Sequence, residues 1–220
     1  AFNGCSAMTL IEIPQQITTI KTGSFSSTGL TNVTYLGTTN PTTCETGAFP
    51  TVQHVEVSFK YTDTTKFCGL LPRTTGVCGA SETACNYTYL HIAKSLTISG
   101  NGAMNTYSAT NIAPWLEKKT LISSISITGI TSIGAYAFNG CTGFSTLTIP
   151  ESVTSLGNYA FNGCTGLTSI TWNKIQTIGS NTFQGCTKLT KLQLPDTLTT
   201  IGTYAFDGCI LVETLTFNKV

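Results

Sequence analysis

A nine-residue string that recurs four times between residues 133 and 209 constrains this chain more than any other feature. It reads I-G-A-Y-A-F-N-G-C, L-G-N-Y-A-F-N-G-C, I-G-S-N-T-F-Q-G-C and I-G-T-Y-A-F-D-G-C. The phenylalanines of the four strings, Phe138, Phe161, Phe183 and Phe206, are 23, 22 and 23 residues apart. A constant period of about 20 to 30 residues indicates one supersecondary unit stacked on copies of itself. The string therefore predicts a solenoid in which equivalent side chains form columns.

Apolar triads of the form L-x-x-L-x-L separate the strings and predict one β-strand per unit. They are Ile122, Ile125 and Ile127; Phe144, Leu147 and Ile149; Leu167, Ile170 and Trp172; Leu189, Leu192 and Leu194; and Val212, Leu215 and Phe217. Neighbouring strands of a parallel ladder lie ~4.8 Å apart. We expect a mostly β, right-handed leucine-rich-repeat-type coil with a parallel strand ladder and short helical or 3-10 corners.

The period divides the chain into three segments. Residues 121–220 form the regular array. Residues 1–59 repeat the same unit in degenerate form, with strands predicted at residues 8–13, 30–35 and 52–59. Residues 60–120 lack the period, and their aromatic side chains favour an irregular β-rich cap or connector over a disordered linker. Within them, Leu96 and Ile98 alternate with polar residues before Gly100-Asn101-Gly102, which is typical of a β-hairpin or short sheet.

Composition limits the possible partners and locations. Only 10% of the residues are charged and the formal net charge is +1, so the chain lacks the dense basic face that nucleic acid requires. No apolar run is long enough to insert into a membrane. Threonine makes up about a fifth of the chain, which suits exposed β surfaces outside the cell. The sequons at Asn32 and Asn86 are candidate N-glycosylation sites and point the same way.

Eight of the nine cysteines fall into two groups, and the ninth, Cys44, aligns with the core position of Ile20. Cys5, Cys141, Cys164, Cys186 and Cys209 occupy one repeat position, where stacked Cβ atoms run parallel; a column of buried free thiols is favoured over a disulfide ladder. Cys68, Cys78 and Cys85 lie in the loop-rich segment, where a disulfide would stabilise most, and we expect Cys78 to pair with Cys68 or Cys85. Their spacing lacks a zinc chelate, and neither His54 nor His91 stands at ligand spacing, so no metal, cofactor or catalytic residue is predicted.

The residues between the apolar positions of each strand must point outward. In the last four units these candidate partner-binding residues are Thr146 and Thr148, Ser169 and Thr171, Lys191 and Gln193, and Thr214 and Thr216. They predict two columns of small hydroxyls with one basic interruption. Threonine also favours exposed strands that bind nothing, so the pattern fits an inert surface equally well.

The I-G-x-Y-A-F-x-G-C and L-T-I-P-E-S-V-T-S-L-G strings resemble the BspA-like leucine-rich repeat family, found in surface proteins of bacteria and protists. The segment from L-T-I-S-G-N-G-A-M to A-P-W also resembles the lead-in to the repeats in that family. This resemblance implies an extracellular or cell-surface scaffold for adhesion or protein binding, with no catalytic residues to carry over.

We therefore expect a non-catalytic scaffold at the cell surface that binds a protein or glycan ligand. Two alternatives remain open. Because the chain starts just before a corner and stops just after a strand, copies could stack end to end into an extracellular filament. An ice- or crystal-binding face built from the Thr-x-Thr pairs is the other alternative, although Lys191 and Gln193 break its column.

Overall fold

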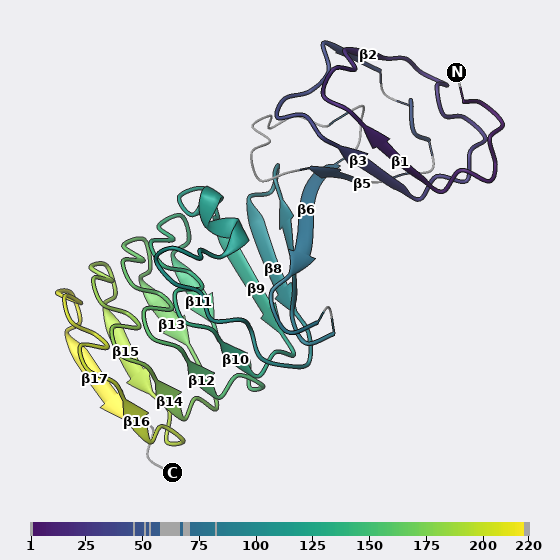
Figure 1. Ribbon diagram of the computed structural model, residues 1–220. Helices are drawn as coiled ribbons and strands as arrows, with labels where there is room; N and C mark the ends of the chain where they lie inside the picture. The colour runs from purple at the N-terminus through teal and green to yellow at the C-terminus, as the bar shows by residue number, and fades with distance from the viewer. Residues whose placement is uncertain are drawn as a thin grey trace. The chain divides into compact units, whose positions relative to one another are not determined.

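The computed structural model describes residues 2–45, 47–50, 52, 54–57, 67, 71–81 and 83–217. The chain forms two compact units, the first of residues 1–75 and 89–93 and the second of residues 76–88 and 94–220. The division therefore falls inside the segment that lacks the period. Nearly all regular structure is β-strand (Figure 1), and the only helix among the described residues is η1 (Pro114–Lys118), a short 3-10 helix.

The first unit is a stack of parallel strands, as the degenerate repeat predicts. Its strands are β1 (Leu10–Ile13), β2 (Thr19–Ile20), β3 (Asn32–Tyr35), β4 (Thr43–Cys44) and β5 (His54–Val57), followed by β6 (Leu71–Val77), which continues into the second unit. β1 pairs with β3, β3 with β5 and β5 with β6, while β2 pairs with β4 on the return side. Register places Ile13 beside Tyr35, and the rings of Phe2, Phe25 and Phe49 stack at 5.3 and 4.7 Å. The three predicted strands are confirmed with shorter bounds; residues 58 and 59 lie outside the described residues.

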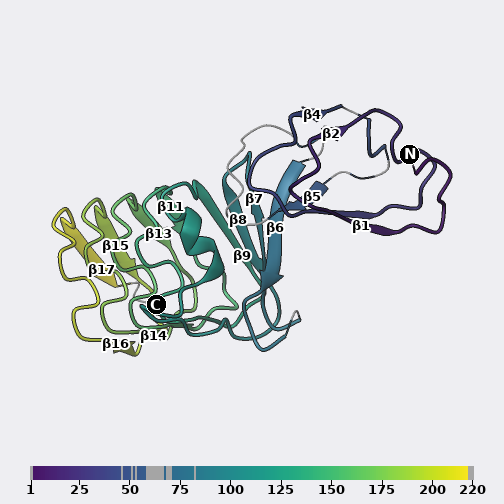
Figure 2. The same ribbon diagram turned by 45° about the horizontal axis from the view of Figure 1, so that its top comes forward.

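The second unit is the regular solenoid. Its front strands are β8 (Ser95–Ser99), β9 (Ser124–Thr128), β11 (Thr146–Thr148), β13 (Ser169–Thr171), β15 (Lys191–Leu194) and β17 (Thr214–Phe217). Its return strands are β10 (Ser132–Ile133), β12 (Ser155–Leu156), β14 (Thr177–Ile178) and β16 (Thr200–Ile201), which form one parallel sheet in that order. β7 (Asn86–Leu90) has residues in both units. Figure 2 shows front and return strands on opposite sides of each turn of this coil.

A column of phenylalanine rings forms the core of the solenoid. Ring centroids of Phe138, Phe161, Phe183 and Phe206 are separated by 5.1, 5.3 and 5.4 Å, and adjacent rings are inclined by only 2° to 7°. The first three side chains are fully buried. The constant sequence spacing therefore becomes a constant stacking distance, which confirms the predicted columns.

The corners differ from the prediction. They are turns and not 3-10 helices, and the tyrosine or asparagine of each string has a positive φ of 57° to 59°. The glycine that follows the phenylalanine by two residues also has a positive φ, 70° at Gly140 and 68° at Gly163, as the Asn-Gly pairs predict. The first glycine of the string has another role. A Cβ at Gly157 would lie 2.4 Å from the backbone nitrogen of Ala135 on the preceding rung.

Of the two structures predicted for residues 96–102, the short sheet is confirmed and a hairpin closed by Gly100-Asn101-Gly102 is wrong, because β8 lies between β7 and β9 in one sheet. β8 pairs with β9 in parallel, with Leu96 opposite Ile125 and Ile98 opposite Ile127, so the chain after Gly102 continues around a rung of the solenoid. On the return side of this rung, Ala103 bridges to Ser132. A hairpin closed by Gly100-Asn101-Gly102 would have required the strand after that turn to fold back beside β8, a place that β9 takes in parallel. The buried apolar residues of β8 instead extend the columns of the array.

Candidate functional site

The eight predicted strand-face residues, Thr146, Thr148, Ser169, Thr171, Lys191, Gln193, Thr214 and Thr216, are all exposed. Register aligns Thr146 with Ser169 and Thr148 with Thr171 across β11 and β13. It aligns Lys191 with Thr214 and Gln193 with Thr216 across β15 and β17. The strands thus form a surface with two columns of polar side chains, which we call the strand face.

The strand face is polar because the intervening residues turn inward. Leu147 is 2% exposed and Leu192 is 5% exposed, although their neighbours on either side are exposed. Successive side chains of a strand point to opposite faces, so burial of the leucines directs the hydroxyls to solvent. The face offers hydroxyl and amide groups, which donate and accept hydrogen bonds.

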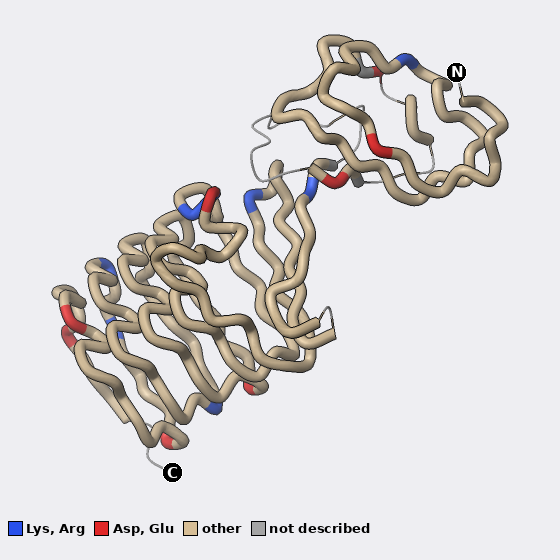
Figure 3. Tube along the Cα trace, in the orientation of Figure 1, with Lys and Arg blue, Asp and Glu red and all other residues tan. Residues whose placement is uncertain are grey.

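Lys191 carries the only charge among the eight residues. Charged residues are sparse throughout the chain and in the second unit lie mainly at the turns (Figure 3). One exposed pair joins Lys174 Nζ to Glu151 Oε2 at 3.1 Å. The strand face contains no histidine, cysteine or carboxylate, so it presents hydrogen-bonding groups and a single cation.

The thiol column lies inside the coil and is chemically quiet. Cys141, Cys164 and Cys186 are free and buried, and Cys209 is free and half-buried. Cys164 Sγ donates to the carbonyl oxygen of Phe138 at 3.3 Å, and Cys186 Sγ donates to that of Phe161 at 3.4 Å. Burial raises the pKa of Cys141 and Cys186 to about 12 and that of Cys164 well above its usual value. These thiols therefore stay protonated and weakly nucleophilic at neutral pH.

Cys5 does not follow the prediction for this column, because it is exposed. Residues 2–5 belong to the first described corner of that unit, so no described rung precedes Cys5. Cys141, Cys164 and Cys186, which have a rung on each side, confirm the predicted column of buried free thiols.

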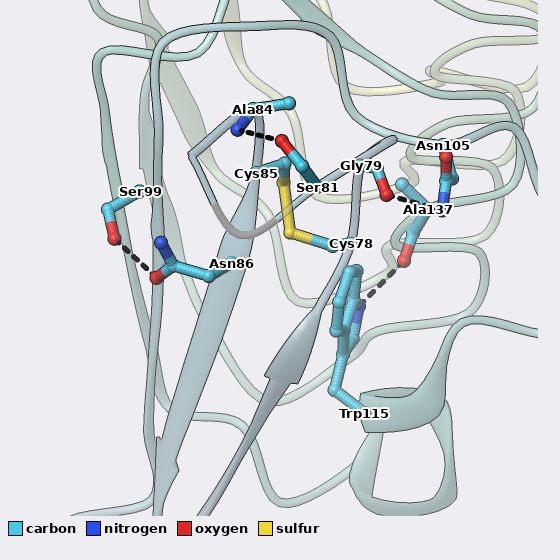
Figure 4. The surroundings of a disulfide bond; sticks show 10 residues. All are labelled: Cys78, Gly79, Ser81, Ala84, Cys85, Asn86, Ser99, Asn105, Trp115 and Ala137. Carbon is cyan, nitrogen blue, oxygen red and sulfur yellow. Dashed lines mark hydrogen bonds between the residues drawn. A yellow bond between two sulfur atoms is a disulfide. The ribbon is translucent and has the colours of Figure 1, made fainter.

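A disulfide joins Cys78 to Cys85, with an S–S distance of 2.05 Å and seven residues of sequence separation (Figure 4). Both residues are fully buried. The amide of Cys78 donates to the carbonyl oxygen of Cys85 at 2.9 Å, and the amide of Asn105 donates to that of Cys78. The disulfide closes the loop of residues 78–85, and the hydrogen bond from Asn105 holds this loop against the first rung of the second unit. Cys68, the other predicted partner of Cys78, lies outside the described residues.

The two sequons differ in exposure. Asn32, the first residue of β3, is exposed. Asn86 is half-buried in β7, and its Oδ1 accepts a hydrogen bond from Ser99 Oγ at 2.8 Å (Figure 4). A glycan on Asn32 would meet less of the protein than one on Asn86.

Both histidines belong to the first unit. His54 begins β5, and its side chain lies outside the described residues. His91 lies in the turn directly after β7. Its Nε2 is 2.9 Å from Thr74 Oγ1, and the buried ring packs edge-on against Tyr89. These contacts indicate that His91 contributes to the packing of the first unit.

Two further structural tests concern metals and membranes. Across the part of the chain that the structure describes, no three His, Cys, Asp or Glu side chains are grouped as a metal site would require. No helix among the described residues is long and apolar enough to cross a bilayer.

The sequence reading missed a ladder of side-chain amides along the corners. Asn139 Nδ2 donates to Asn162 Oδ1 at 3.2 Å, Asn162 Nδ2 donates to Gln184 Oε1 at 3.1 Å, and Gln184 Nε2 donates to Asp207 Oδ2 at 2.9 Å. The position between phenylalanine and glycine is polar in all four strings, a signal that could have revealed the ladder.

In-register strands, stacked phenylalanines and a recurring turn define a parallel β-solenoid of leucine-rich-repeat type. The sequence profile of the BspA type leucine rich repeat region matches residues 1–68 and 110–220 in six copies. The chain therefore belongs to the BspA-type leucine-rich repeat family.

Several solved structures are similar to this chain. A leucine-rich repeat protein from Eubacterium ventriosum is 26% identical over 66% of this chain and 44% of its own, with a TM-score of 0.49. A leucine rich cell surface protein from Faecalibacterium prausnitzii is 23% identical over 96% of this chain and 39% of its own, with a TM-score of 0.37. The present chain thus spans less than half of either protein. Among curated proteins, none matches.

Proposed function

We propose that this chain is a non-catalytic repeat scaffold, displayed outside the cell, whose strand face binds a protein or glycan partner. The observation that carries the proposal is the set of exposed polar side chains on β11, β13, β15 and β17, in register between β11 and β13 and between β15 and β17. Exposed faces of solenoids are their usual binding surfaces, because stacking repeats extends one rigid face without adding loops.

Location outside the cell is supported by composition and by family. A threonine-rich surface with only 10% charged residues, an exposed sequon at Asn32 and a buried disulfide all suit an oxidising compartment. The BspA-type family to which the chain belongs is associated with surface proteins. Detection of Asn32 glycosylation or surface labelling of intact cells of the source organism would test this part of the proposal.

The binding part of the proposal is tested by charge-matched double variants. Thr148→Arg with Thr171→Arg places two bulky cations on the strand face, whereas Thr154→Arg with Gln176→Arg places two on exposed positions of the return side. Both variants should fold, since all four side chains are exposed. Binding to immobilised extracellular-matrix proteins and to a glycan array is then measured.

We expect the unmodified chain and the return-side variant to bind the same protein or glycan with similar Kd. The strand-face variant should bind it with a Kd at least tenfold higher. Equal loss in both variants would indicate a nonspecific charge effect and contradict the proposal. Failure of the unmodified chain to bind any member of either panel would favour an inert strand face.

A further inference from the structure

A second aromatic column runs along the corners, outside the phenylalanine core. The rings of Tyr136 and Tyr159 stack with centroids 4.7 Å apart and planes inclined by 17°. Both residues have the same positive φ, and both are half-buried. The Tyr136 amide donates to the Asn158 carbonyl oxygen, and the Tyr159 amide donates to that of Ser180, each at 3.0 Å. These backbone hydrogen bonds hold the tyrosine of one rung directly beside the equivalent residue of the next rung.

Asn181 interrupts this column. Its φ of 58° equals that of the tyrosines within 1°, and its amide donates to the carbonyl oxygen of Thr203, so the backbone continues in register to Tyr204. The asparagine side chain is shorter than a tyrosine ring. Among the described rings, Tyr159 stacks only on Tyr136, and Tyr204, which is 65% exposed, stacks on none. One ring face of Tyr159 and the ring of Tyr204 are therefore left without an aromatic neighbour at the Asn181 rung.

The gap that Asn181 leaves in the tyrosine column corresponds to one aromatic ring. Tyr159 and Tyr204 are two rungs apart, which corresponds to ~9.5 Å at the spacing of parallel strands. A flat ring midway between them would lie at about the 4.7 Å that separates Tyr136 from Tyr159. Aromatic rings stack at centroid distances of about 4.5 to 7 Å, so both tyrosines could contact it.

The polar groups beside this position can both accept and donate hydrogen bonds, because each side-chain amide nitrogen has two N–H groups. Asn181 Nδ2 donates to Gln184 Oε1 at 2.9 Å, which leaves Asn181 Oδ1 as an acceptor at the interruption. Gln184 Nε2 binds one carboxylate oxygen of the exposed Asp207. A ligand ring whose edge both donates and accepts hydrogen bonds, and which presents an apolar face to the tyrosines, matches this arrangement. A pyranose has both properties, whereas a phenylalanine ring has only the second.

We propose that the Asn181 interruption, flanked by Tyr159 and Tyr204, is a binding site for one pyranose ring of a neutral glycan. The site lies at the corners, where no residue of the strand face is found, so it does not depend on the strand-face proposal. The pyranose would insert edge-on between Tyr159 and Tyr204. It would take the place of the tyrosine ring that the other three strings have at the position of Asn181.

The test uses the 220-residue chain with methyl β-D-glucopyranoside and methyl β-D-galactopyranoside as probes. Saturation-transfer NMR should show contact to the ring protons of at least one glycoside, with millimolar affinity. Asn181→Tyr restores the repeat residue and fills the position, and Tyr204→Asn removes one wall with a residue that the fold already accepts at positive φ. Each variant should weaken binding by at least tenfold.

Tyr136→Asn is the matched control, because it removes a tyrosine of the same column and leaves both walls of the interruption. It should retain binding within threefold, and so should the strand-face variant Thr148→Arg with Thr171→Arg. Circular dichroism melting identifies any variant that does not fold. Undiminished transfer in Asn181→Tyr, absence of transfer from both glycosides, or selective binding of N-acetyltyrosinamide in their place would each overturn the proposal.

Discussion

The indole Nε1 of Trp115 donates a 2.7 Å hydrogen bond to the carbonyl oxygen of Ala137 (Figure 4). The same indole ring lies 5.7 Å from Phe138, inclined by 30°, and both residues are fully buried. Trp115 therefore occupies the rung before Phe138 in the phenylalanine column. Tyr87 and Tyr107 pack edge-on against it at 5.2 and 5.7 Å, so the regular column ends in a cluster of perpendicular rings.

Trp115→Phe should lower the free energy of unfolding of the second unit by about 1 to 3 kcal/mol. The substitution keeps an aromatic ring but leaves the buried carbonyl oxygen of Ala137 without the indole donor. Urea denaturation followed by circular dichroism measures the change. Tyr204→Phe, which removes only an exposed hydroxyl, serves as the control, and a loss in Trp115→Phe no larger than in that control would contradict the role of the hydrogen bond.

Phe161→Ala should destabilise the second unit by about 3 to 5 kcal/mol, because it empties a fully buried position between two stacked rings. Phe206→Ala should cost less, since Phe206 is half-buried. The two variants carry the same substitution and differ only in its position along the phenylalanine column. Equal losses in urea denaturation would show that stacking on both sides adds nothing to stability.

Stability should fall between about pH 9 and pH 12 as a result of the thiol column. Burial raises the pKa of Cys141 and Cys186 from 9.0 to about 12, so unfolded thiols lose protons first as pH rises. Because the unfolded state then binds fewer protons than the folded state, the free energy of unfolding decreases by up to about 1.4 kcal/mol per pH unit per thiol. Below pH 9 this contribution is fully present.

Comparison of the chain with Cys141→Ala and Cys186→Ala variants tests this dependence. The readout is the slope of unfolding free energy against pH from 9 to 10, which should be shallower in the variants whatever their stability at neutral pH. Burial also raises the pKa of Tyr107 to about 12, so the range above pH 10 includes tyrosine ionisation and is less suited to the test. An unchanged slope would contradict the assignment to the thiols.

Replacement of both Cys78 and Cys85 by alanine should cost about 2 kcal/mol. The two cysteines are only seven residues apart in sequence, and a disulfide that closes a short loop stabilises less than one that closes a long loop. Double substitution avoids reducing other cysteines. The variant Cys5→Ala changes an exposed free thiol and should leave the unfolding free energy within about 0.5 kcal/mol of the unmodified chain.

The repeating part of the fold could be predicted because its cause is local and periodic. Spacings of 23, 22 and 23 residues place Phe138, Phe161, Phe183 and Phe206 on successive rungs, and alternation of polar and apolar residues determines which side chains of β11 face solvent. Trp115 lies 23 residues before Phe138 and keeps the spacing, but no A-F-x-G-C string surrounds it to mark it as part of the column. Its position depends on the parallel pairing of β8 with β9, a contact between residues about 30 apart.

The strand face could be located from the sequence, but the corner columns could not. A tyrosine at positive φ is uncommon, since the left-handed region disfavours bulky side chains. Three copies of this conformation become visible only with coordinates, at Tyr136, Tyr159 and Tyr204. The exchange of Tyr-Ala for Asn181-Thr182 was apparent as a departure from the repeat. Its consequence, a break in a stack of rings, required the stack to be seen.

Every rung of the regular array presents nearly the same outline to the rung before it and the rung after it, as the matching strand registers and glycine approaches show. Removal or duplication of one whole unit would therefore join surfaces that already fit. Recombination between repeats within the gene could therefore lengthen or shorten the solenoid without disturbing its packing. Substitutions at the exposed positions of single repeats could then change the surface independently.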